Sequence, residues 1–169
     1  LDVLEPHLVA VVLEAEVSLA REVLEGLVEF VTGAVGARAG FDPFVGVERL
    51  LFIPDLFNYL LTGVAKAEYT IASTSQMLDA RSKGWAGSLV EEFGIPGSLL
   101  PELVDTGSRL GALLPHVAAE TGAEGMQVVA TAGHDTASAV AAVPASKGTW
   151  CYISSGTWSL MGVETPEPI

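Results

Sequence analysis

A compact apolar segment followed directly by a short polar turn constrains the fold of this chain more than any other feature. Residues 126–132 are mostly apolar, and Gly133, His134, Asp135 and Thr136 come next. Residues 137–142 contain only alanine, serine and valine, a composition that predicts a closely packed helix. The pattern predicts a strand, buried on both faces if the sheet is covered on both sides, that leads into a helix, a junction typical of α/β folds. Ligands in such folds bind where a strand ends and a helix begins.

Two aspartates that precede helical segments each allow two interpretations. A carboxylate at the start of a helix can cap the free N–H groups there, or it can accept a proton from a substrate. Asp135 is open to both. Asp55 follows Pro54 in the first turn of a helix predicted to end near Gly63, where capping explains it more simply than catalysis does.

Other elements are predicted from periodicity and from the positions of glycine. Apolar residues at steps of three and four predict a long amphipathic helix from about residue 6 to residue 32, which either covers a core or binds a partner. Residues 84–95 predict a short helix closed by Gly94, in which Trp85 fills space. Residues 68–78 are small and polar enough to line a cleft, or to form an ordinary strand or turn surface.

A β-hairpin is predicted near the end of the chain. Aromatic and β-branched residues at 149–153 and 158–163 flank a Ser-Ser-Gly-Thr turn at 154–157. Glycine lets a ligand approach the backbone closely, and threonine adds a hydroxyl and an amide donor. This chemistry suits a phosphate, although a plain hairpin turn has the same composition.

The charge balance limits the partners. Eight Lys and Arg against 21 Asp and Glu give a net charge of −13, which repels nucleic-acid backbones and anionic lipid surfaces. We therefore expect no nucleic-acid partner, and the uncharged stretches contain too much serine, threonine and glycine for a membrane span. The single cysteine, Cys151, and the lack of a visible secretory signal predict a reducing, cytoplasmic location. Backbone N–H groups or Mg²⁺ can still hold a small anionic ligand.

The order of several motifs resembles the FGGY family of carbohydrate kinases. These motifs are IPDLFNYLLTG, EYTIASTSQML, TAGHDTASAV and YISSGTWSLMG. The resemblance covers about residues 47–164, and its last two motifs are specific as a pair at this separation. It implies the actin-like, ribonuclease-H-like α/β ATPase fold of sugar kinases, here as an incomplete first domain and the opening β-hairpin of the second.

The resemblance also implies a division of the chain. Residues 1–45 form an unassigned helical leader and linker, residues 46–143 the C-terminal part of the family's N-terminal domain, and residues 144–169 the start of its C-terminal domain. The family's ATP phosphate loop and adenine pocket are expected outside this sequence. We therefore expect an internal segment of a kinase that is a poor catalyst, or none, by itself.

The activity implied by the resemblance is transfer of a phosphoryl group from ATP to a sugar, with Mg²⁺ bridging the phosphates. Asp135 would be the general base, His134, Asp135 and Thr136 would contact the sugar, and no metal ligand is expected from the protein. Gly156 and Thr157 would belong to the ATP phosphate site. The residues after Thr157 favour L-rhamnulose as substrate, giving L-rhamnulose 1-phosphate in L-rhamnose catabolism. The alternatives are another kinase of the family, such as an L-fuculose kinase, or a non-catalytic truncated kinase module.

Overall fold

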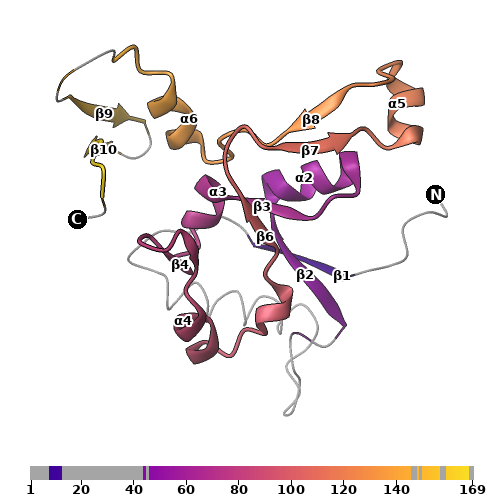
Figure 1. Ribbon diagram of the computed structural model, residues 1–169, viewed down its shortest axis with the longest axis horizontal. Coiled ribbons are helices and arrows are strands. Elements are labelled where there is room, and N and C mark those ends of the chain that lie inside the picture. The colour runs from indigo at the N-terminus through magenta and orange to yellow at the C-terminus, as the bar shows by residue number, and fades with distance from the viewer. Residues whose placement is uncertain are drawn as a thin grey trace.

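The computed structural model describes residues 8–12, 44, 46–145, 148, 150–156 and 159–167. Over these residues short strands pair two by two, and short helices lie between them (Figure 1). The strands are β1 (Leu8–Val12), β2 (Val47–Phe52), β3 (Lys66–Glu68), β4 (Leu78–Asp79), β5 (Gly84–Trp85), β6 (Glu102–Val104), β7 (Arg109–Ala112), β8 (Gln127–Val129), β9 (Cys151–Ser155) and β10 (Ser159–Val163). The helical elements are α2 (Ile53–Thr62), α3 (Tyr69–Ser73), α4 (Gly87–Glu92), the 3-10 turn η2 (Gly97–Leu99), α5 (Pro115–Thr121) and α6 (Asp135–Ala141).

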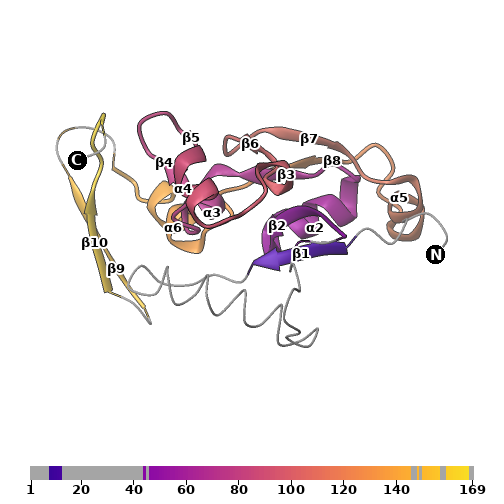
Figure 2. The same cartoon turned by 90° about the horizontal axis from the view of Figure 1, so that it is seen from below.

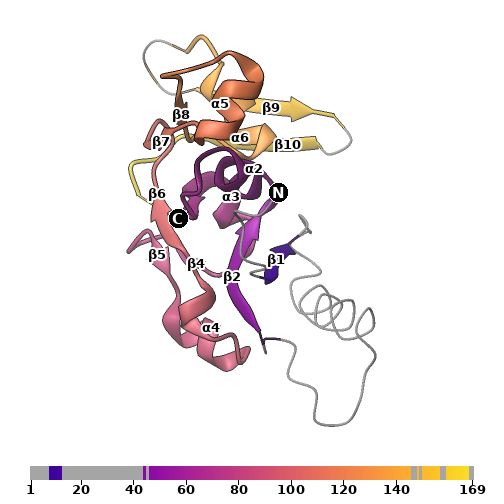
Figure 3. The same ribbon diagram turned by 90° about the vertical axis from the view of Figure 1, so that its right-hand side faces the viewer.

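The strand pairs are of both kinds, parallel and antiparallel. β1 pairs with β2 and β3 pairs with β6 in parallel, so a longer connection joins the two strands of each pair. The pairs β4–β5, β7–β8 and β9–β10 are antiparallel. Figure 2 shows the β9–β10 hairpin at one end of the molecule and α5 at the other. Figure 3 shows α4 far from the β7–β8 hairpin, which lies against α2.

The first strand corrects the prediction of a helix that begins near residue 6. Leu8–Val12 forms β1, parallel to β2, with Val12 opposite Phe52. Three of its five residues are valines, whose β-branched side chains favour strands. A parallel partner therefore outweighs the helical periodicity over these residues. The remainder of the predicted helix lies outside the described residues.

Helix α2 forms where proline and glycine predict it. Pro54 lies in its first turn, and Gly63 ends it with a left-handed φ of 74° and an N–H that donates to Tyr59 O at 2.7 Å. The N-cap is Phe52, and its side chain makes no capping hydrogen bond. The interpretation of Asp55 as a helix cap is therefore wrong, because its carboxylate accepts a hydrogen bond from β3 instead.

The core lies between β2, β3, α3 and η2. Its buried members are Leu50, Phe52, Ala67, Ile71, Ala72 and Leu99. A smaller cluster of Met77, Val90 and Ile95 lies beside α4. Trp85 packs against both clusters, and its Nε1–H donates to Pro101 O at 2.9 Å, which confirms its predicted space-filling role.

Two predicted elements differ from the structure in extent or burial. Val129 of β8 is 43% exposed, so the prediction of a strand buried on both faces is wrong. β8 pairs with β7 as an antiparallel hairpin, and such a hairpin can leave one face in solvent. The helix predicted over 84–95 covers only Gly87–Glu92, because Gly84 and Trp85 pair with β4.

The hairpin predicted near the end of the chain is confirmed. β9 and β10 pair antiparallel, with Ser155 opposite Ser159 and Cys151 opposite Val163. Within the described ranges, no helix has the length and apolar character needed to cross a membrane.

Candidate functional site

The polar turn at residues 133–136 leads into α6 and presents Asp135 at the first residue of the helix. His134 is the N-cap and has extended backbone angles, so the interpretation of Asp135 as the N-cap is wrong. The Asp135 side chain is 94% exposed, and its Oδ1 lies 3.7 Å from His134 Nδ1. The same oxygen accepts the Thr136 N–H at 2.6 Å. The turn therefore offers an open carboxylate between an imidazole and a hydroxyl.

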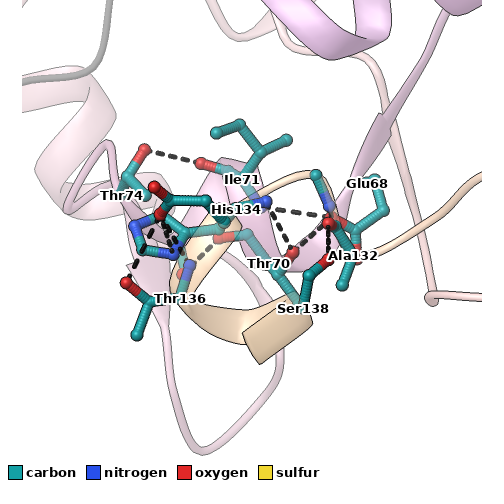
Figure 4. A network of polar contacts seen from close by, with 11 residues as sticks. Glu68, Thr70, Ile71, Thr74, Ala132, His134, Thr136 and Ser138 are labelled. Carbon is teal, nitrogen blue, oxygen red and sulfur yellow. Dashed lines mark hydrogen bonds and ion pairs between the residues drawn. The ribbon is translucent and has the colours of Figure 1, made fainter. Parts of the chain in front are cut away.

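The buried side chain of Glu68 joins this turn to the core (Figure 4). Glu68 ends β3, acts as the N-cap of α3 and is 1% exposed. Its Oε2 accepts the Gly133 N–H at 3.0 Å, the Ile71 N–H at 3.2 Å and the Thr70 hydroxyl at 2.5 Å. Its Oε1 accepts the Thr106 hydroxyl at 2.5 Å. Residues far apart in the sequence thus meet at one carboxylate.

Two further hydrogen bonds fix the turn. Thr70 Oγ1 accepts the His134 N–H at 3.3 Å, so the same hydroxyl group contacts both Glu68 and the turn. On the other side, Ser138 Oγ donates to Ala132 O at 2.7 Å, which joins α6 to the segment before the turn (Figure 4). The backbone that carries Asp135 is therefore held from α3 and from α6 itself.

Opposing effects set the pKa of Glu68. Burial acts to raise the pKa of this carboxyl, because a charged group loses the stabilisation of water. The hydrogen bonds from Thr106, Thr70 and Gly133 favour the charged form and together outweigh burial, so the pKa lies below its ordinary value. Glu68 is therefore a carboxylate at neutral pH and can only accept hydrogen bonds.

Asp55 lies next to Glu68, and its pKa is shifted in the opposite direction. It is 2% exposed, and its Oδ1 accepts the Glu68 backbone N–H at 3.0 Å. Its Oδ2 is buried and has no hydrogen-bond partner within the part of the chain that the structure describes. Burial raises the pKa of Asp55 to about 7; the Glu68 N–H opposes this rise and the Glu68 charge adds to it. A buried acid of this kind keeps its proton at mildly acidic pH.

The residues expected at the ATP phosphates lie on the hairpin. Gly156 is exposed directly after β9, and β9 lies against α6. Thr157, expected at the same site, lies outside the described residues. Across the residues with described positions, no three His, Cys, Asp or Glu side chains gather in a way that could hold a metal ion.

Sequence reasoning missed the residues that support the turn. The sequence predicts that residues 68–78 line a cleft or form an ordinary surface, and it assigns no role to Glu68 or Thr70. Thr106 stood in no motif. The available sign was a glutamate directly before a short helix that begins at Tyr69. A glutamate is usually exposed, however, and nothing local indicates that this one is buried.

Comparisons with known proteins agree on the family. The model of the FGGY family of carbohydrate kinases, N-terminal domain, matches residues 42–142, which is more than half of the chain. A rhamnulokinase of Bacteroides thetaiotaomicron is 45% identical over 122 residues, which are 72% of this chain and 25% of that protein. A rhamnulokinase of Enterococcus faecalis is 44% identical over 117 residues, covering 69% and 24% of the two chains. The chain thus spans about a quarter of the length of these curated relatives.

Solved structures of sugar kinases share the fold. A gluconate kinase from Lactobacillus acidophilus aligns with a TM-score of 0.52 at 13% identity, covering 69% of this chain and 28% of that one. A xyloylose kinase from Brucella ovis aligns with a TM-score of 0.51 at 22% identity, covering 69% and 26%. These alignments confirm the predicted sugar-kinase fold, of which this chain is one part. The chain belongs to the FGGY family of carbohydrate kinases.

Proposed function

We propose that this chain is part of an ATP-dependent kinase that converts L-rhamnulose into L-rhamnulose 1-phosphate in L-rhamnose catabolism. The observation that carries the proposal is the identity of 45% over 122 residues to a protein named rhamnulokinase. The open carboxylate of Asp135 at the start of α6 supplies the chemistry that such a reaction needs. Residues 46–143 would belong to the N-terminal domain of this kinase and residues 144–169 to the start of the second domain, with residues 1–45 unassigned.

Asp135 is proposed as the general base. A sugar hydroxyl attacks the terminal phosphorus of ATP, the bond from phosphorus to ADP breaks, and the hydroxyl proton passes to the Asp135 carboxylate. His134 and Thr136 flank Asp135 on the same turn and would bind neighbouring sugar hydroxyls. Phosphoryl transfer depends mainly on the positions of the reacting groups and on charge neutralisation. A fixed turn would therefore favour the reaction by holding Asp135 in place.

The hairpin is proposed to bind the ATP phosphates. Gly156 is exposed and has no side chain, so a phosphate oxygen can approach its backbone. Thr157 follows it in the SSGTW motif and is assigned to the same site. Mg²⁺ would be held mainly by the ATP phosphates and water, and it would neutralise charge on the transferring group. We place the protein in the cytoplasm, where ATP is available and where the single cysteine, Cys151, stays reduced.

The substrate is tested by measuring ADP release from the complete natural protein that contains these residues. L-Rhamnulose and L-fuculose are compared with Mg-ATP, and the sugar phosphate is identified by mass spectrometry. Faster turnover of L-rhamnulose supports the proposal, and faster turnover of L-fuculose assigns another branch of the family. A folded protein that turns over neither sugar and does not bind Mg-ATP supports the non-catalytic module. The 169 residues alone should turn over poorly, since they span about a quarter of the relatives' length.

The role of Asp135 is tested by Asp135→Asn in the complete protein. Turnover should fall by about 10²- to 10⁴-fold, because the amide cannot accept the proton. The stability should change little, since the side chain is 94% exposed. Glu120→Gln, at an exposed position of α5, is the control and should leave turnover unchanged. Retained turnover in Asp135→Asn would refute the assignment.

A further inference from the structure

Glu68 and Thr70 together hold the two residues that precede Asp135, and we propose that they are positioning residues for the reaction. We call this pair the Glu68–Thr70 clamp. It rests on the proposed function, because the position of Asp135 affects a rate only if Asp135 acts as the base. Neither member of the clamp was expected to have a role from the sequence.

The clamp fixes two consecutive backbone N–H groups. Glu68 Oε2 accepts the Gly133 N–H at 3.0 Å, and Thr70 Oγ1 accepts the His134 N–H at 3.3 Å. The Thr70 hydroxyl donates its proton to Glu68 Oε2 at 2.5 Å, which leaves its lone pairs for His134. Because Glu68 is charged and can only accept, these directions are the consistent set. The peptide groups immediately before Asp135 therefore have a fixed orientation.

Gly133 lets the turn lie close to α3 and to Glu68. A Cβ added at this residue would lie 3.2 Å from Ile71 Cβ and 3.4 Å from Glu68 Oε2. The first distance is tighter than an ordinary carbon–carbon contact of about 3.5–4.0 Å. The turn thus lies directly against α3 and the clamp, and any displacement of the clamp passes to the backbone that carries Asp135.

The clamp is itself held from two sides. Thr106, in the turn after β6, donates to Glu68 Oε1 at 2.5 Å, and the Glu68 backbone N–H donates to Asp55 of α2 at 3.0 Å. The described partners of this buried carboxylate are all neutral donors, and together they offset the cost of burying its charge. An apolar residue here would leave these donors, the Gly133 N–H among them, without an acceptor. The carboxylate therefore supports the turn as well as α3 and Thr106.

Two matched substitutions separate positioning from stability. Thr70→Val and Thr106→Val each remove one hydroxyl that donates to the Glu68 carboxylate at 2.5 Å. Only Thr70 also accepts the His134 N–H. In the complete protein both variants should lower the urea midpoint, Thr70→Val by more because it loses two hydrogen bonds. We expect kcat, measured where both variants are folded, to fall on the order of tenfold or more in Thr70→Val and by clearly less in Thr106→Val, with KM for ATP unchanged in both.

A second pair of variants tests the carboxylate. Glu68→Gln keeps one carbonyl oxygen for the turn, and its amide can face the Thr106 hydroxyl, so kcat should be largely retained. Glu68→Ala removes both acceptors and should lower kcat on the order of 10²-fold. Equal kcat losses in Thr70→Val and Thr106→Val, or equal losses in Glu68→Gln and Glu68→Ala, would overturn the clamp.

Amide hydrogen exchange tests the clamp by a measurement that does not depend on enzymatic activity. In the absence of sugar and ATP, the amide of His134 should exchange roughly tenfold faster in Thr70→Val than in Thr106→Val, because only Thr70→Val removes its acceptor. The same exchange in both variants overturns the clamp, whatever the activity. If the two variants show the exchange difference but the wild-type protein phosphorylates no sugar, the proposed function and the positioning role are overturned, while the clamp itself stands.

Discussion

The buried carboxyl of Asp55 should make the protein less stable as the pH rises through neutrality. Asp55 is 2% exposed, and burial is the main cause of the rise in its pKa from 3.8 to about 7. Between these two values the folded chain keeps a proton that the unfolded chain has lost. The stabilisation from Asp55 is therefore complete below pH 3.8 and is lost as the pH rises to about 7.

The size of this effect follows from the pKa. One pKa unit corresponds to about 1.36 kcal/mol, and the interval from pH 5 to a pKa of about 7 is two units. The free energy of unfolding should thus fall by about 2–3 kcal/mol between pH 5 and pH 8 on account of Asp55, with about 3 kcal/mol as the upper bound. Asp55→Asn cannot titrate, and its carbonyl oxygen still accepts the Glu68 N–H. The variant should therefore lack this part of the pH dependence.

Urea unfolding at pH 5, 6, 7 and 8, followed by fluorescence and circular dichroism, measures the difference between Asp55→Asn and wild type. The variant should gain stability relative to wild type as the pH rises. Asp79→Asn is the control: Asp79 is exposed, and the Arg81 N–H and the Ser82 hydroxyl lower its pKa. The stabilisation from Asp79 is lost only on acidification below pH 4. The free energy of unfolding of this variant should therefore change with pH over this range as that of wild type does. Parallel curves for Asp55→Asn would show that the buried carboxyl does not hold its proton.

Two further predictions concern packing. Gly133→Ala should lower turnover of the complete protein at least several-fold, because the added Cβ would lie 3.2 Å from Ile71 Cβ; Gly97→Ala, whose Cβ meets nothing within 4 Å, should not. Trp85→Phe should lower the free energy of unfolding by about 1 kcal/mol, since it removes the hydrogen bond to Pro101 O at 2.9 Å; an unchanged urea midpoint would contradict this.

Local chemistry made part of the fold predictable. Pro54 and Gly63 mark the two ends of α2 because each restricts or permits a backbone angle independently of tertiary structure. The β9–β10 hairpin was predictable for the same reason, since a glycine-containing turn lies between two β-prone flanks. The junction between β8 and α6 was located correctly because the composition changes abruptly on both sides of residues 133–136, of which Asp135 and Thr136 open α6.

The predictions were wrong where residues distant in the sequence determine the local structure. Residues 8–12 have helical periodicity, but the hydrogen bonds from β2 make them a strand. β8 has the composition of a covered strand, yet its position in a hairpin with β7 exposes Val129. Glu68 shows the same limit most clearly: its partners Thr106 and Gly133 lie 38 and 65 residues away, so no local pattern could indicate its burial.

The separation between Glu68 and Gly133 also bears on the order of folding. The bond from Glu68 N–H to Asp55 closes a loop of 13 residues, whereas the bond from Gly133 to Glu68 closes one of 65. The longer closure costs about 1.4 kcal/mol more in chain entropy. During synthesis the chain emerges from its N-terminal end, so α2 and β3 can associate before residues 133–136 leave the ribosome. The turn that carries Asp135 can therefore dock onto a scaffold that forms before it, and weakening the bond from Gly133 to Glu68 should delay the maturation of the proposed activity more than the appearance of helix content.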